Sequence, residues 1–250
     1  MKPLFEDITF KINKDFRCFK QGQELKIKLM NFGVNYIVGP NGSGKSTLIH
    51  AIRAKKHSLA DINRHDFDGM VPNDDKLFNT DELISVEGLD SYDEIFVLDS
   101  VDDDPLSFTN SATASGLVGG GGYSMLHLSK GQKAQAMQTK FLVKLQEVTG
   151  FNPADYRAGK TYDKNPLIIV DEIDEGLDIK NQVMFNKLLN NIASIYHATL
   201  ICICHNFLCI GAGLGGMRYP VYDITQNKIV EIGEYIEAQT GLKLTIDKKQ

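Results

Sequence analysis

Residues 39 to 47 have the composition of a loop that holds phosphate. They read Gly-Pro-Asn-Gly-Ser-Gly-Lys-Ser-Thr. Glycines let backbone N–H groups turn toward phosphate oxygens where larger side chains would obstruct them. Lys45 is expected to reach the β- and γ-phosphates of a nucleotide, and Ser46 to offer its hydroxyl to Mg²⁺. The predicted nucleotide contacts are Asn41, Gly42, Ser43, Gly44, Lys45, Ser46 and Thr47.

Two acidic residues, Asp171 and Glu172, directly follow the apolar run 167–170. Ligand sites of α/β sheets lie at the carboxyl ends of such strands. Asp171 is therefore predicted to hold Mg²⁺ through water, and Glu172 to polarise an attacking water as a general base. Alone, the pair would equally suit two solvent-facing acids. The phosphate loop upstream favours the catalytic interpretation.

Three further positions each have an ordinary structural explanation beside a functional one. Ser129 can cap a helix that begins near Lys130, and with the N–H groups around Gly131 it can form a second anion site. Asp178 is a candidate N-cap for the helix that follows it. His205 follows an apolar run, and a lone histidine says little by itself.

The segments around the glycine loop have the periodicity needed to position it. Residues 5–12 and 25–29 alternate apolar and polar side chains, as half-buried strands do. Residues 34–38 form a more apolar strand that runs into the loop, and residues 46–56 are helical in pattern. A strand, a loop and a helix in this order are the context that a phosphate-binding loop requires.

The rest of the chain alternates strands and helices. Strands are predicted at 94–99, 167–170, 200–204 and near 220 and 228, with helices at 130–148, 178–195 and 233–239. Residues 61–93 are expected to form short helices and loops, and the glycine-rich residues 102–123 a loop that orders on binding. The predicted fold class is α/β, with a mainly parallel sheet flanked by helices and an N-terminal antiparallel sub-sheet.

The order and content of these motifs resemble the ATP-binding cassette (ABC) ATPases, a branch of the P-loop NTPases. The resemblance implies one ATPase domain over residues 1–250. Its parts would be a basic β lobe with the phosphate loop (1–60), an acidic, glycine-rich lobe (61–127), and a third part (128–250) holding the signature helix, the Walker B strand and the C-terminal strands.

Family likeness also implies roles for the positions that were ambiguous above. Ser129, Gly131 and Gln132 would contact the γ-phosphate of an ATP held by the other subunit. Asp178 would link the two sites across the dimer, and His205 would sense the γ-phosphate. The implied cofactors are ATP and Mg²⁺, and the implied assembly is an ATP-dependent homodimer that hydrolyses ATP.

The chain departs from the transporter pattern at two points. The family usually has a glutamine after the strand predicted at 94–99, whereas Asp99 and Ser100 occupy that place. Either one of these residues replaces the glutamine, which makes Asp99 a candidate metal ligand, or metal contact there is weaker. Ile173 stands where transporter ATPases usually have proline. The segments 38–44 and 171–178 look more like the SMC and RecF-like chromosome and repair ATPases. The long coiled-coil arms of SMC proteins are missing, so the chain resembles a stand-alone head.

The distribution of charge along the chain does not identify the binding partner. The chain carries −5 in total, but residues 61–104 hold 15 Asp and Glu against Arg64 and Lys76, whereas residues 1–60 hold 11 Lys and Arg against 4 acids. The basic lobe could bind DNA. Two solvent-exposed charged surfaces without a nucleic-acid partner explain the pattern equally well. No apolar run is long enough for a membrane segment, and the N-terminus lacks a signal-peptide pattern, so we expect a cytoplasmic protein.

Three functions therefore remain open from the sequence. The first is an ATPase in nucleic-acid maintenance, repair or defence. The second is a regulatory ATP-binding subunit of a larger complex with an effector protein. The third is a transporter ATPase subunit, which Ile173 and the missing glutamine disfavour.

Overall fold

The computed structural model describes residues 4–58, 63–66, 80–99, 139, 142–143, 145–146, 149–171, 178–203, 210 and 219–241. The strands are β1 (Phe5–Ile12), β2 (Glu24–Met30), β3 (Val34–Val38), β4 (Asn63–Asp66), β5 (Ile84–Glu87), β6 (Glu94–Asp99), β7 (Pro166–Asp171), β8 (Thr199–Ile203), β9 (Pro220–Asp223) and β10 (Lys228–Glu231). The helices are α1 (Lys45–Ser58), α2 (Thr80–Leu83), α5 (Pro153–Arg157), α6 (Ile179–Tyr196) and α8 (Ile232–Thr240).

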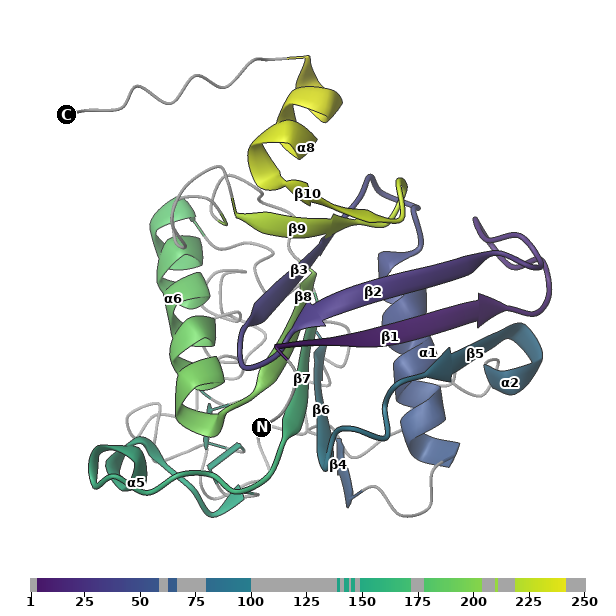
Figure 1. Cartoon of the computed structure of the whole chain (residues 1–250). Coiled ribbons are helices and arrows are strands. Elements are labelled where there is room, and N and C mark those ends of the chain that lie inside the picture. Colours follow the sequence, from purple (N-terminus) through teal and green to yellow (C-terminus); the bar gives the residue numbers. More distant parts are fainter. Residues whose placement is uncertain are drawn as a thin grey trace, which may run out of the picture.

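The larger sheet has seven strands in the order β10-β9-β3-β8-β7-β6-β4 (Figure 1). Its pairs are parallel except β9 with β10, which form an antiparallel hairpin. Strands β3, β7 and β8 are almost wholly buried, which matches their continuous apolar sequence. Because parallel strands end at one edge, the residues after β3, β6, β7 and β9 gather at the same edge of the sheet.

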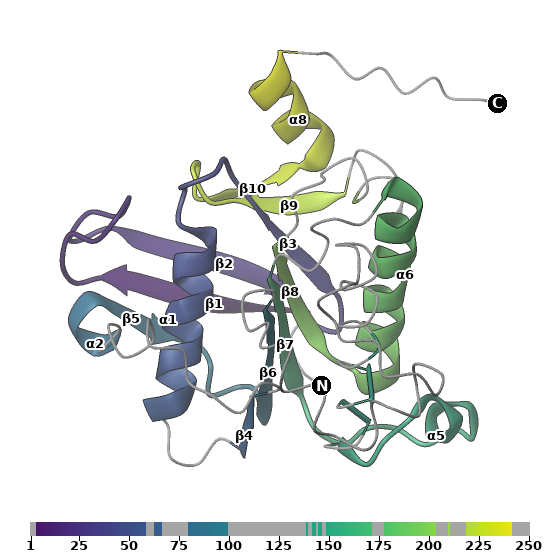
Figure 2. The same cartoon turned by 180° about the vertical axis from the view of Figure 1, so that it is seen from behind.

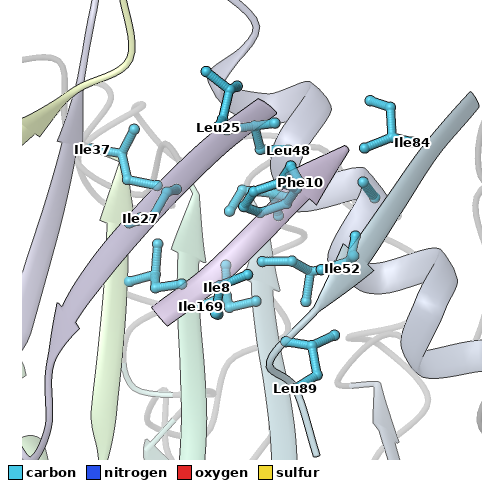
Figure 3. Close-up of a cluster of buried hydrophobic side chains, with 14 of the residues drawn as sticks. Ile8, Phe10, Leu25, Ile27, Ile37, Leu48, Ile52, Ile84, Leu89 and Ile169 are labelled. Carbon is cyan, nitrogen blue, oxygen red and sulfur yellow. The ribbon is translucent and has the colours of Figure 1, made fainter. Parts of the chain in front are cut away.

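A smaller antiparallel sheet has the order β2-β1-β5. Its alternating strands place Ile8 and Phe10 of β1 and Leu25 and Ile27 of β2 on one buried face. Figure 3 shows this face packed toward α1 and the main sheet, with Leu48 and Ile52 of the helix among the buried side chains. The sub-sheet therefore fixes α1, and with it the loop that precedes α1.

Helices α1 and α6 lie on opposite sides of the main sheet (Figure 2). Helix α6 buries Phe185, Leu189 and Ile192 in a second apolar cluster with Tyr36 and Leu200 of the sheet. Within the described ranges, no helix is both long and apolar enough to cross a membrane.

The predicted strands at 5–12, 25–29, 34–38, 94–99 and 167–170 are confirmed, as are the helices over 46–56 and 178–195. The expectation of only short helices and loops over 61–93 was wrong: β4 extends the main sheet, and β5 extends the sub-sheet. Both strands have four residues, so their sequence periodicity is short and their state depends on pairing with β6 and β1. Helix α5 was not predicted, and most of the predicted helix 130–148 lies outside the described residues.

Candidate functional site

The loop between β3 and α1 has the backbone shape that its glycines allow. Gly42 and Gly44 adopt φ values of +79° and +94°, which other residues reach only with strain. A Cβ on Gly44 would lie 2.3 Å from Cζ of Phe19, whereas one on Gly42 would meet nothing within 4 Å. Gly44 is thus closed on the side of the β1–β2 connection, and Gly42 is open to an approaching group.

Lys45 is the first residue of α1 and is 6% exposed. Its ammonium donates to the carbonyl oxygens of Gly39 at 2.8 Å and Pro40 at 3.1 Å, so it lies inside the curve of the loop. The first turn of α1 contains no acidic residue, so no side chain of that turn offsets the positive end of the helix dipole. The loop therefore combines a lysine, backbone N–H groups and a helix N-terminus, the combination that binds phosphate.

The other predicted contacts in this loop have defined places. Asn41 is exposed at the tip, and Ser43 donates its backbone N–H to the Pro40 carbonyl at 3.2 Å. Ser46 is half-buried in the first turn of α1, whereas Thr47 is 2% exposed. Ser46 is thus the residue of this turn that is open enough to offer its hydroxyl to a metal ion.

Thr47 has a partner that the sequence did not suggest. Arg17 donates from Nη1 to Oγ1 of Thr47 at 3.1 Å. Arg17 is exposed, has φ +53°, and its guanidinium lies 5.2 Å from the centre of the Phe16 ring. It occupies a tight turn closed by two backbone hydrogen bonds between Phe16 and Phe19. The only sequence signal was a basic residue among aromatics in the connection between two alternating strands.

Asp171 and Asp99 end neighbouring parallel strands. Asp171 is the last residue of β7 and is 3% exposed, and Asp99 is the last residue of β6. The register pairs Asp99 directly with Asp171. The strand ends therefore bring two predicted metal ligands to adjacent positions at the edge where the phosphate loop begins. Their binding of Mg²⁺ stays a prediction.

Asp178 caps α6, one of the two roles considered for it. Its carboxylate accepts from the backbone N–H of Asn181 at 2.8 Å and from the Asn181 side chain at 3.0 Å. Asp178 is exposed, so a contact with a second subunit is compatible with the cap. Glu172, His205, Ser129, Gly131 and Gln132 lie outside the described residues, and their roles stay predictions.

The backbone around Gly44 leads to one stability prediction. Gly44→Ala should lower the free energy of unfolding by about 2–4 kcal/mol, because it combines left-handed strain with a clash against Phe19. Gly42→Ala is the matched control, with similar strain and open space, and should cost only about 1–2 kcal/mol. Urea unfolding of both variants measures the difference. Equal losses would show that Phe19 does not close the loop on this side.

Comparisons with known proteins agree with this geometry. The AAA domain family matches residues 13–55, which contain both the Arg17 turn and the phosphate loop. No curated protein matches the chain in sequence.

Solved structures resemble the chain over most of its length. A metal-chelate type ABC transporter in an inward-facing conformation has a TM-score of 0.50 and 15% identity, over 99% of this chain and 93% of that one. The SMC head domain from Thermotoga maritima has a TM-score of 0.46 and 20% identity, over 91% and 98%. A bacterial ABC exporter with ATP bound has a TM-score of 0.48 and 16% identity, over 97% of this chain and 42% of the exporter.

The sequence identities to these structures are low, so the similarities are evidence for the fold alone. The family match and the arrangement of the two sheets agree with the resemblance to SMC and RecF-like ABC ATPases predicted from the motifs. The chain has the P-loop fold of the ABC-type ATPases, with an antiparallel sub-sheet beside a mainly parallel sheet flanked by helices.

Proposed function

We propose that this chain binds ATP with Mg²⁺ and hydrolyses it to ADP and phosphate. The observation that carries the proposal is the glycine loop around the Lys45 ammonium, at the sheet edge where Asp171 ends β7. Space above Gly42 is open, which suits a phosphate approaching the backbone, and Lys45 supplies a cation there. This donor set fits a triphosphate and its metal ion.

The proposed roles follow the order of strands across the sheet. Lys45 and the backbone of residues 41–47 hold the β- and γ-phosphates. Ser46 and Asp171 hold Mg²⁺, with Asp99 beside Asp171 as a further ligand. A metal ion held by these residues would supply positive charge against the charge that develops on the phosphate oxygens. Glu172, the next residue after Asp171, polarises the attacking water, and His205 senses the γ-phosphate.

The proposal includes an ATP-dependent homodimer. In it, Ser129, Gly131 and Gln132 of one subunit close the site of the other, and Asp178 contacts the opposing site. The ABC-type fold and the exposure of Asp178 support this arrangement. ATP would then switch the protein between an open and a closed dimer, a state that a partner protein or nucleic acid can read.

A role in nucleic-acid maintenance, repair or defence is the biological setting we propose, on the likeness of segments 38–44 and 171–178 to SMC and RecF-like ATPases. The basic lobe adds little support for DNA binding, because four of its lysines are paired with carboxylates. The pairs are Lys11 with Glu87, Lys14 with Glu82, Lys20 with Asp15 and Lys26 with Asp7. Glu82 and Glu87 come from the acidic segment, so the two charge excesses partly cancel where β5 joins β1.

Substitution of Arg17 tests the nucleotide site without changing a residue of the phosphate loop. Arg17→Ala should weaken ATP–Mg²⁺ binding roughly ten-fold, because it removes a charged donor beside Thr47 at the loop. Lys20→Ala is the matched control, since Lys20 is an exposed cation in the same connection, bonded to Asp15. Calorimetric titration with ATP and Mg²⁺ measures both. An unchanged affinity in Arg17→Ala would place the nucleotide away from this turn.

A further inference from the structure

The sheet order gives the direction in which a bound nucleotide lies, if the proposed function holds. Strand β3, which leads into the phosphate loop, lies between β9 and β8. Asp171 ends β7, on the far side of β8. The reacting γ-phosphate must face Asp171, so the phosphate chain runs toward β8 and β7. The nucleoside at the other end therefore extends toward β9.

The turn between β9 and β10 lies against the phosphate loop on that side. Ile224 donates its backbone N–H to the carbonyl of Val38, the last residue of β3, at 3.0 Å. A Cβ on Gly39 would lie 2.5 Å from Cγ2 of Ile224. Figures 1 and 2 show the β9–β10 turn at the end of the sheet where β3 finishes. This turn is thus a described segment that borders the loop on the side opposite Asp171.

One end of the turn is fixed by a buried carboxylate. Asp223 is 0% exposed and accepts hydrogen bonds from the backbone N–H of Thr225 at 2.8 Å, from its hydroxyl at 2.6 Å, and from Nε2 of Gln226 at 2.7 Å. Thr225 and Gln226 are nevertheless exposed. The exposed side-chain amide of Gln226 is thereby held in one orientation by the buried Asp223.

The other end of the turn is tied to the sub-sheet. Asn227 adopts φ +51°, and its Oδ1 accepts from the Tyr222 hydroxyl at 2.5 Å and from the Lys26 backbone N–H at 3.2 Å. Burial and the nearby Asp223 charge raise the pKa of Tyr222 to about 12, so this phenol remains a donor at neutral pH. The turn is therefore preorganised before any ligand arrives.

Gln226 then presents one defined hydrogen-bonding group. Its Nε2 is the atom that donates to Asp223, because a carboxylate only accepts. Its Oε1 accepts no hydrogen bond from the residues that the structure describes, and it is the atom left to meet a ligand. A fixed acceptor selects a donor and disfavours another acceptor.

We propose that Gln226 selects the nucleobase, by accepting a hydrogen bond from the exocyclic amino group of adenine. Adenine carries this amino donor on C6 of the ring, whereas guanine carries a carbonyl oxygen on C6. Hypoxanthine, the base of ITP, also carries a carbonyl oxygen there, and otherwise differs from adenine only by the hydrogen on N1 that accompanies this carbonyl. ITP is therefore the probe for the amino edge of the base.

The experiment measures the affinities of ATP and ITP, each with Mg²⁺, for the wild type, Gln226→Ala and Gln239→Ala. Gln239 is an exposed glutamine on α8 and serves as the matched control. The wild type and Gln239→Ala should bind ATP roughly ten-fold more tightly than ITP, the value of about one hydrogen bond. Gln226→Ala should bind the two nucleotides with affinities within about two-fold of each other.

The outcomes separate this inference from the proposed function. Equal binding of ATP and ITP by the wild type would overturn the role of Gln226, and so would a preference that persists in Gln226→Ala. Either result leaves nucleotide binding itself intact. If the wild type bound neither nucleotide, the proposed function would fail together with this inference.

Discussion

Lys45→Ala is expected to weaken ATP binding by at least roughly 100-fold. The substitution removes the ammonium that lies within the curve of the phosphate loop, at 2.8 Å from the Gly39 carbonyl. With it would go the proposed charge-assisted contacts to two phosphates. Titration with ATP and Mg²⁺ measures the loss. The affinity of Lys28→Ala should stay at the wild-type value, because Lys28 is exposed on the sub-sheet beside the Phe5 ring.

A loss of ATP affinity in Lys45→Ala tests the site only if the variant protein is still folded. Lys45 is buried and donates to two loop carbonyls, so its loss also affects the loop. Lys45→Arg keeps the charge but replaces a compact ammonium by a larger planar group, and should also bind poorly. Circular dichroism establishes that each variant is folded. A folded Lys45→Ala protein with wild-type affinity for ATP would remove the loop from the site.

Glu172→Gln is expected to lower ATP turnover by roughly 100-fold or more, while ATP still binds. A positioned general base contributes about this much to hydrolysis, and glutamine keeps the shape but cannot take a proton. ATP that is bound and not hydrolysed should hold two subunits together. Phosphate release measures the first effect, and light scattering with ATP and Mg²⁺ measures the second.

Glu234→Gln is the control for this pair of measurements. Glu234 is an exposed acid in the first turn of α8, and its substitution changes the net charge equally. Turnover and mass should match those of the wild type. A Glu172→Gln protein that stays monomeric at saturating ATP would rule out the dimer switch, whereas normal turnover would rule out Glu172 as the base.

The sequence alone predicted the elements whose signal lies in consecutive residues. The apolar strand at 34–38, the glycine loop and the helix after it are consecutive, so periodicity and glycine placement together predict their structure. The buried strands β7 and β8 were visible for the same reason, as apolar runs of strand length. Strand β5 was missed because its four residues become a strand only by pairing with β1, more than seventy positions earlier in the chain.

The contacts that shape the candidate site depend on tertiary structure. Arg17 reaches Thr47 across thirty positions, because the β1–β2 connection folds onto the start of α1. The turn at 223–227 meets the phosphate loop because β9 pairs with β3, which no local pattern predicts. Asp99 was proposed as a metal ligand because it stands where the family usually has a glutamine, and only the register shows it beside Asp171.

Steady-state phosphate release from ATP by the wild-type protein tests the central claim most directly. It should be run with Mg²⁺, with a chelator in place of Mg²⁺, and with Lys45→Ala as the blank. The proposed site predicts release that requires both the metal ion and Lys45. Release by the wild type that equals the Lys45→Ala blank at saturating ATP, together with no ATP binding, would contradict the assignment of this chain as an ATPase.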